Sequence, residues 1–458
     1  MGADAAMTAR PSIGQYAHDL GSGRVTSRAL VEDCLARIAD PQGEGARTFI
    51  GTNPAAARAA ADAADRARSL GFPASRYAGI PVSVKDLFDI AGETTRGGSL
   101  VLADAPPASA DSTVVARLRA AGLVIIGRTN MTEFAYSGLG LNPHYGTPRN
   151  PYGREIGRIP GGSSSGATIS VTDGMAVAGL GTDTGGSCRI PAALTGTVGF
   201  KPTASRVPRD GVLPLSTSLD SVGSIAPSVA CCAVIDAIIA GEAARAPDPF
   251  PLAGLRLAVP QSLVLDDMDA TVASAFTAAV SALSASGARV QDLPLRELLE
   301  LPSINAKGGL VAAEAYAWHR RLLATRGAEY DPRVSVRIEK GAEQSAADYI
   351  QVRAARLDFM GRIQSRCAHL DALIMPTTPL VAPAIAELAD DKNYARINLL
   401  MLRNPTLVNF LDGCAVSVPC HRRGEAPVGL MIAGPCGSDQ RILAIARAIE
   451  SALDPMRE

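Results

Sequence analysis

The chain has 458 residues and is 47% apolar, which is enough for a large core in one domain or in two or three. Its 44 Lys and Arg against 45 Asp and Glu give a formal charge of -1, so charge gives no reason to expect nucleic acid or an anionic membrane as partner. The eight cysteines form neither a disulfide framework nor paired CxxC motifs, which argues against a zinc site and fits a reducing compartment.

The N-terminal residues show no basic stretch followed by an apolar core, and no apolar run reaches the roughly 18 residues that span a bilayer. A cytoplasmic location is therefore expected. Residues 11–70 are predicted to be helical, with Ser12 and Ser27 as candidate N-caps and an alanine-rich stretch over 54–69. We expect this part to pack around the outside.

Short β-branched runs that end in Gly, Pro or polar turns follow, as in buried strands of an α/β sheet. They cover residues 80–90, 123–127, 177–182, 256–260, 372–376, 415–419 and 428–433. Helical patterns lie between them, for example over 112–121, 268–287 and 438–453. This alternation predicts one wound sheet with helices on both faces, in a single domain of residues 1–458. The Pro-rich segment 243–254 is interpreted as a surface crossover within that domain.

Two glycine loops carry serines in a chain with only five histidines. In the second loop, Gly185, Gly186 and Ser187 can turn sharply and aim several backbone N–H groups at one point, as an oxyanion hole requires. Ser187 is therefore a candidate nucleophile. A serine nucleophile needs a proton acceptor nearby, and Lys85, in the apolar frame GIPVSVKDLFDI, is the best candidate.

The first loop, residues 161–166 (GGSSSG), allows other interpretations. It lacks the GK[ST] ending of a phosphate-binding loop. It also matches GxSxG, a nucleophile elbow that would make Ser164 the nucleophile and would need a histidine, His319, His369 or His421. That elbow must follow a strand, whereas the charged and proline-broken REIGRIP precedes it. A lone GTDTGGS, residues 181–187, would be interpreted as a tight turn without a catalytic role, but the second serine loop 24 residues earlier makes that interpretation much less favoured.

Several ordered motifs together resemble the amidase signature family over nearly the whole chain. They are GIPVSVKDLFDI (79–90), STVVARLRAAGLVIIGRTNMTEFA (112–135), YGTPRNP (145–151), RIPGGSSSGA (158–167), GLGTDTGGSCRIPAALTGTVGFKPT (179–203) and, more loosely, ALIMPTTP (372–379) and residues 415–434. The resemblance implies a large mixed central β-sheet covered by α-helices on both faces, with a signature core at about 79–203. It also implies a catalytic triad of Ser187 as nucleophile, Ser163 after a cis peptide bond, and Lys85 as base.

The same resemblance implies an oxyanion hole built from the backbone N–H groups of Thr184, Gly185, Gly186 and Ser187. Ser164 is expected to support the lysine side of the network, and Asp183 with Arg189 to fix the loop. A lysine works as a base only if its pKa is lowered, and burial among apolar neighbours would lower the pKa of Lys85. The chain departs from the family pattern at Cys188, which we interpret as a packing residue, and at Ser165.

The resulting expectation is an amidase that hydrolyses a linear carboxamide through a Ser187 acyl-enzyme, without a metal or other cofactor. The alternative is the glutamine-hydrolysing A subunit of a tRNA-dependent amidotransferase, which has an acidic residue about where Leu402 falls here. A catalytically inactive binding protein is disfavoured because all three triad positions are present. The expected partner is a small amide, with no nucleic acid and no membrane, and a homodimer would be unsurprising.

The pocket is expected among the loops 131–145, 303–320 and 375–381, with Met131, Tyr136 and Asn142 as candidate wall residues.

Overall fold

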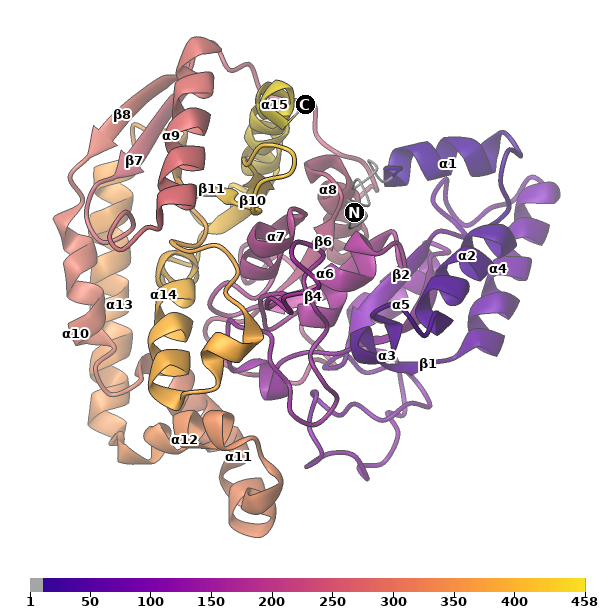
Figure 1. Cartoon of the computed structure of the whole chain (residues 1–458), viewed down its shortest axis with the longest axis horizontal. Helices are drawn as coiled ribbons and strands as arrows, with labels where there is room; N and C mark the ends of the chain where they lie inside the picture. Colours follow the sequence, from indigo (N-terminus) through magenta and orange to yellow (C-terminus); the bar gives the residue numbers. More distant parts are fainter. Residues whose placement is uncertain (1–10, 458) are drawn as a thin grey trace.

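The computed structural model describes residues 11–457. An 11-stranded sheet crosses the molecule in the order β1-β3-β2-β4-β6-β5-β10-β11-β9-β7-β8. The strands are β1 Phe49–Thr52, β2 Pro81–Lys85, β3 Val124–Thr129, β4 Ala178–Asp183, β5 Val198–Lys201, β6 Ser221–Ala226, β7 Arg256–Pro260, β8 Arg289–Leu293, β9 Ala372–Pro376, β10 Cys414–Pro419 and β11 Gly429–Gly434. Figure 1 shows β1 with the indigo N-terminal helices at one end of this sheet and β7 and β8 at the other.

The sheet is mixed, as the family resemblance implied. β2 pairs parallel with β3 and β4, and β7 pairs parallel with β8 and β9. Every other pairing, including those of β5 with β6 and β10, is antiparallel. The strands β2, β4, β5, β6 and β10 are buried along their whole length. Strands covered on both faces read as continuous rather than alternating apolar runs, which is why the sequence pattern located most of them.

Helices form a layer on each face of the sheet. Their bounds are α1 Ile13–Gly21, α2 Ser27–Ala39, α3 Gly45–Thr48, α4 Pro54–Ser69, α5 Thr113–Ala120, α6 Ser165–Thr172, α7 Arg189–Thr195, α8 Val229–Ala240, α9 Ala270–Ala285, α10 Leu301–Ile304, α11 Gly309–Arg326, α12 Pro332–Glu339, α13 Ala346–Cys367, α14 Asp391–Phe410 and α15 Asp439–Arg457. One layer contains α8, which contacts α1, α5 and α15. The other contains α6, α7 and α14, with α7 in contact with both of the others.

Several local expectations need correction. The segment expected to be wholly helical also contains β1, which joins the sheet edge beside β3. Ser12 caps α1 as expected, but Thr26 rather than Ser27 caps α2, because its side chain accepts from the Ala29 N–H. The strand expected over 80–90 ends at Lys85, where the chain turns. Three further strands, β5, β6 and β8, lack a pattern strong enough to have been predicted.

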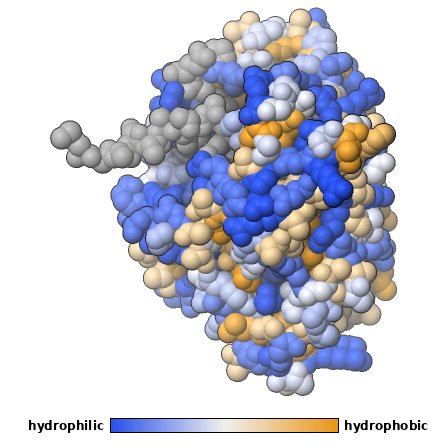
Figure 2. Space-filling model, turned by 90° about the vertical axis from the view of Figure 1, so that its right-hand side faces the viewer, coloured by the Kyte–Doolittle hydropathy of each residue, from blue (hydrophilic) through white to orange (hydrophobic). Residues whose placement is uncertain are grey.

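No helix within residues 11–457 combines the length and apolarity needed to cross a membrane. The face that carries the N-terminal helices is largely hydrophilic, with apolar residues in small scattered groups (Figure 2). The Pro-rich segment 243–254 connects α8 to β7, as expected.

Candidate active site

The site lies at the carboxyl ends of two parallel neighbours, β2 and β4. Their register pairs Val84 with Leu180, so the residues that end the two strands, Lys85 and Asp183, reach the same edge of the sheet. In open α/β sheets this edge is where ligands bind. The two glycine loops of the sequence meet here, because the first leads into α6 and the second connects β4 to α7.

Lys85 contacts the first loop directly. Its side chain is fully buried, and Nζ donates to Ser163 Oγ at 2.8 Å and to Thr182 Oγ1 at 3.0 Å. The Gly162–Ser163 peptide bond is cis. Lys85 is thus held by two hydroxyls, with no carboxylate among its hydrogen-bond partners in the described chain.

Burial lowers the pKa of Lys85 to about 8, although the negative charges of Asp183 and Asp220 act in the opposite direction. Desolvation disfavours the ammonium form, so a substantial neutral fraction exists near neutral pH. Burial also raises the pKa of Cys188 to about 12, and Asp183 adds to that effect. A thiol so hard to ionise does not serve as a nucleophile, which supports its interpretation as a packing residue.

The loop that carries Ser187 is fixed by a buried ion pair. Arg189 donates to Asp183 from Nε at 3.0 Å and from Nη2 at 2.8 Å, and both side chains are fully buried. Asp183 also accepts the backbone N–H groups of Gly186, at 2.8 Å, and Cys188, at 3.1 Å. Burial by itself raises the pKa of Asp183, but the charge of Arg189 outweighs it and holds that pKa below its usual range. The carboxylate therefore stays ionised and binds the backbone on both sides of Ser187.

This arrangement restricts which N–H groups can hold an oxyanion. The Gly186 N–H is already engaged by Asp183, which leaves those of Thr184, Gly185 and Ser187. Gly186 has φ 123°, a region open to glycine. Gly186 turns the loop at this point. Ser187, the next residue, is only 3% exposed.

The two serine loops touch through their backbones. The Ser164 N–H donates to the Ser187 carbonyl oxygen at 3.3 Å, and Ser164 Oγ donates to the carbonyl oxygen of Thr182 at 3.4 Å. Within the described residues the Ser163 and Ser187 hydroxyls share no hydrogen bond. Catalytic hydrogen bonds are often long without substrate and tighten in the complex.

The nucleophile-elbow interpretation of Ser164 fails, because a loop and not a strand leads into α6. His319, one of the histidines that such an elbow would need, is fully buried between Phe134 and Trp318, and its Nδ1 lies 2.9 Å from the Tyr330 hydroxyl. Burial lowers the pKa of His319 to about 3.

Helix α14 covers the Ser187 loop. A Cβ atom at Gly138 or Gly185 would lie 3.3 or 3.5 Å from Leu402 Cδ2, and one at Gly185 would lie 3.0 Å from Thr406 Oγ1. Leu402 and Thr406 are four residues apart and so share a helix face. An apolar side chain thus lies between the loop after β3 and the nucleophile loop.

The expected wall residues have different roles. Met131 is fully buried, and its Cγ would lie 2.9 Å from a Cβ at Gly98. Asn142 holds the loop together, because its Nδ2 donates to the Gly98 and Met131 carbonyls and its Oδ1 accepts from the backbone of His144. We therefore assign Asn142 to bracing the loop. Tyr136 follows Phe134 and Ala135, both of which have positive φ.

Arg337, from α12, lies 4.3 Å above the Tyr136 ring and donates to the Tyr136 carbonyl oxygen. Backbone conformations such as those of Phe134 and Ala135 cluster at functional sites.

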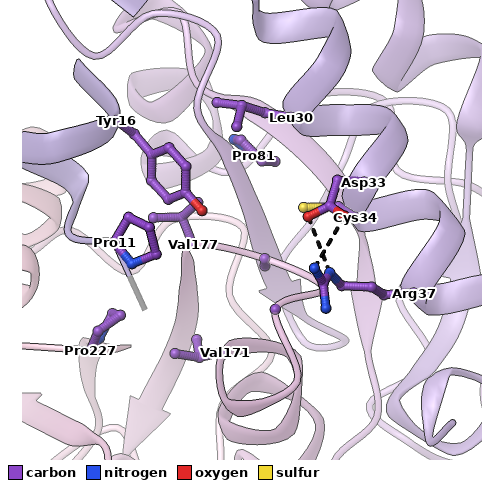
Figure 3. Close-up of a pocket in the computed structure, with 12 residues that line it drawn as sticks. Pro11, Tyr16, Leu30, Asp33, Cys34, Arg37, Pro81, Val171, Val177 and Pro227 are labelled. Atoms are coloured by element: carbon purple, nitrogen blue, oxygen red, sulfur yellow. Dashed lines mark hydrogen bonds and ion pairs between the residues drawn. The ribbon is translucent and has the colours of Figure 1, made fainter. Parts of the chain in front are cut away.

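A cavity of about 160 Å³ lies at the amino ends of β2 and β4, on the opposite side of the sheet's central part from the candidate site. Figure 3 shows Tyr16, Leu30 and Pro81 around it, with the Arg37–Asp33 ion pair to one side. Pro81 begins β2 and Val177 precedes β4, so this cavity is at the amino ends of the strands that carry Lys85 and Asp183 at their carboxyl ends. It is separate from the candidate site.

Sequence reasoning did not find Thr182, Asp220, Arg337 or Thr406. Thr182 directly precedes Asp183 on β4, but successive strand residues point to opposite faces, so the position of Asp183 does not predict the contact of Thr182 with Lys85. Asp220 and Arg337 carry no local motif, and only the tertiary fold brings them to the loops.

Comparison with known proteins gives consistent matches. A family model described as Amidase matches residues 29–443. The chain is 36% identical to 2-amino-5-chloromuconic acid deaminase from Comamonas testosteroni, over 96% of each chain. It is 35% identical to the A subunit of glutamyl-tRNA(Gln) amidotransferase from Roseiflexus sp. (strain RS-1), over 94% of each. A crystal structure of an amidase matches with a TM-score of 0.87, at 31% identity over 96% of this chain and 100% of that one.

Proposed function

Because this chain belongs to the amidase family and is a hydrolase that acts on amides, we propose that it cleaves the C–N bond of a small carboxamide through an acyl-enzyme on Ser187. The observation that carries the proposal is the 2.8 Å contact between Lys85 Nζ and Ser163 Oγ beside the Ser187 loop. It gives the hydroxyls a base in a site where no histidine contacts them within the described residues.

In the first half of the proposed reaction, Ser187 Oγ attacks the amide carbonyl carbon. Its proton passes to Ser163 Oγ while the Ser163 proton passes to neutral Lys85. The backbone N–H groups of Gly185 and Ser187, with that of Thr184, hold the negative oxygen. Lys85 then returns a proton through Ser163 to the leaving nitrogen, the C–N bond breaks, and ammonia or an amine departs.

In the second half, water attacks the acyl-enzyme carbonyl. It gives up a proton by the same Ser163–Lys85 route, and the proton returns to Ser187 as the acid leaves. One base thus serves both halves. Ser164 and the Asp183–Arg189 pair keep the two loops in place through the contacts described above.

The alternative function, glutamine hydrolysis within an amidotransferase, predicts a group that pairs with the amino group of glutamine. In this chain Leu402 lies at the position where the family resemblance places that acidic residue, and its side chain packs beside Gly138 and Gly185. A leucine cannot pair with an ammonium group. The leucine at this position therefore favours a free-standing amidase over a glutaminase.

The surroundings of Tyr136 narrow the proposed substrates further. Arg337 is partly buried and forms no ion pair with a carboxylate of the described residues; its guanidinium lies over the Tyr136 ring and donates to the Tyr136 carbonyl oxygen. A guanidinium binds carboxylates in a bidentate manner. We include amides that carry a second, carboxylate group among the candidate substrates, and the relative from Comamonas testosteroni is named for an acid.

The test is ammonia release from a panel of aliphatic, aromatic and carboxylate-bearing primary amides, glutamine included. Ser187→Ala should lower turnover by about 10³-fold or more, as loss of a catalytic nucleophile does. Ser284→Ala, an exposed serine on α9, is the matched control and should behave as the wild type. Turnover retained by Ser187→Ala would refute the acyl-enzyme, and fast release from glutamine alone would favour the glutaminase function.

A further inference from the structure

The proposed mechanism does not use the buried carboxylate of Asp220. This carboxylate lies directly beside residues 183–187, which we call the oxyanion loop. Asp220 precedes β6, and the antiparallel register pairs its neighbour Ser221 with Asp183 at the end of β4. Asp220 is 7% exposed, and no arginine or lysine forms an ion pair with it in the described part of the chain. A buried charge without a counter-ion is costly and needs compensating hydrogen bonds.

Those hydrogen bonds come from the oxyanion loop and from the turn before β6. Thr184 Oγ1 donates to Asp220 Oδ1 at 2.5 Å. The backbone N–H groups of Leu215 and Ser216 both donate to Asp220 Oδ2 at 3.0 Å. One carboxylate thus ties Thr184 to a rigid turn on the neighbouring strand.

The adjoining residue of the oxyanion loop is tied in the same way, since Ser221 Oγ donates to the Asp183 carbonyl oxygen at 2.9 Å. The chain is therefore held at two consecutive residues, Asp183 and Thr184, immediately before Gly185. The directions of the Thr184 and Gly185 N–H groups depend on these two contacts. An error of about 1 Å in such positions can cost roughly 100-fold in rate.

Asp220 also acts on Lys85 through its charge. It favours the protonated form of Lys85, together with Asp183. Burial raises the pKa of Asp220 to about 6, so the carboxylate is ionised where Lys85 titrates. The other charged groups that face it are Arg209, which donates to the Asp220 carbonyl oxygen at 3.2 Å, and Glu314, which accepts from Ser216 Oγ at 2.6 Å.

We propose that Asp220 is a positioning residue that fixes the oxyanion loop through its hydrogen bond to Thr184. The inference rests on the proposed function, because it takes Ser187 as nucleophile and Lys85 as base. The hydrogen bond controls the rate, and the negative charge, which favours the Lys85 cation, gives the test a second readout that a purely structural role would not move.

The test compares Asp220→Asn with Asp236→Asn. Asp236 is a matched control, because it too is a buried carboxylate whose pKa burial raises to about 6, but it pairs with Arg206 away from the site. Two readouts are followed against pH: kcat and KM for the best amide, and the rate at which a fluorophosphonate labels Ser187. The labelling rate needs no knowledge of the natural substrate.

For Asp220→Asn we expect kcat to fall about 10- to 100-fold with little change in KM, because loop alignment matters in the transition state. We also expect the midpoint of both pH profiles to move down, because a nearby negative charge no longer favours the Lys85 cation. Asp236→Asn should leave the midpoint in place. A purely structural defect would lower activity without that downward shift.

An unchanged kcat and midpoint in Asp220→Asn, or an equal shift in Asp236→Asn, would overturn the inference. If Asp220→Asn does not fold, Thr184→Val removes the hydroxyl and keeps the charge; it should lower kcat without moving the midpoint, and a wild-type kcat would refute the positioning role. Failure of the proposed function is distinguishable, because it would appear as turnover and fluorophosphonate labelling that survive in Ser187→Ala.

Discussion

The chemical environment of Lys85 depends mainly on residues that are distant from it in the sequence. The sequence predicted a lysine with a lowered pKa from its apolar frame, and the burial of its side chain confirms that environment. The hydroxyls that hold it, on Ser163 and Thr182, come from other segments of the chain. The negative charges that keep its pKa near 8, rather than lower, come from Asp183 and Asp220. The sequence neighbours of Lys85 therefore predict the direction of its pKa shift but not the size of that shift.

This pKa predicts the pH dependence of the reaction. In the proposed mechanism the base is the neutral amine of Lys85, whose fraction rises with pH, so kcat/KM should rise about tenfold per pH unit well below the midpoint and level off above about pH 8. The measurement is kcat/KM between about pH 5.5 and 10 with an uncharged amide, to keep substrate titration out of the profile. Activity that instead falls as the pH rises toward 8 would rule out Lys85 as the base.

At the scale of elements, the nucleophile loop depends on close packing between α7, α14 and the glycines between them. A Cβ at Gly186 would lie 2.6 Å from Pro405 Cβ and 2.7 Å from Ile190 Cδ1. The sequence predicted that this loop needs glycine for its turn. It could not predict that α14 presses on the loop, because nothing in the pattern of residues 391–410 specifies which loop the helix covers.

We expect Gly186→Ala to destabilise the fold and to abolish most activity. The added methyl group meets Pro405 Cβ, which the proline ring holds in place, and adopts an unfavourable φ, and overpacking of this kind costs about 1–3 kcal/mol. Gly361→Ala is the matched control: it lies within α13 with no atom within 4 Å of the new Cβ, and alanine in a helix is favoured by about 0.5–1 kcal/mol.

Urea unfolding and kcat measure both effects. A fully active and stable Gly186→Ala enzyme would show that α14 and the loop are not packed as described.

At the scale of the whole molecule, one continuous sheet joins the N-terminal strands β1–β6 to the C-terminal strands β7–β11. β5 pairs with β10, and β9 lies between β11 and β7. The sequence predicted one wound α/β sheet because the buried strands are apolar along their length. It missed several strands for different reasons: β1 and β8 are short strands with exposed positions, whereas β6 (SVGSIA) is buried but rich in small and polar residues.

The continuity of this sheet predicts a single cooperative unfolding transition, as the single domain expected from the sequence requires. Loss of far-ultraviolet circular dichroism, tryptophan fluorescence and amidase activity should coincide in urea, because the β5–β10 pairing and the contacts of α7 with α14 and of α8 with α15 join the N-terminal and C-terminal strands. Trp318, the one tryptophan, reports on α11 at the periphery. Two resolved transitions would show that part of the chain folds as an independent domain.

Because α14 packs over the Ser187 loop, the surroundings of this loop are completed late in protein synthesis. When Ser187 leaves the ribosome, the residues that complete its surroundings have not yet been made: Leu402 and Thr406, which lie against Gly185, and Asn409, which donates to Asp183 at 3.0 Å. The nascent chain therefore carries Ser187 in a loop that is not yet anchored, and the surroundings of this loop are completed only when translation is nearly complete.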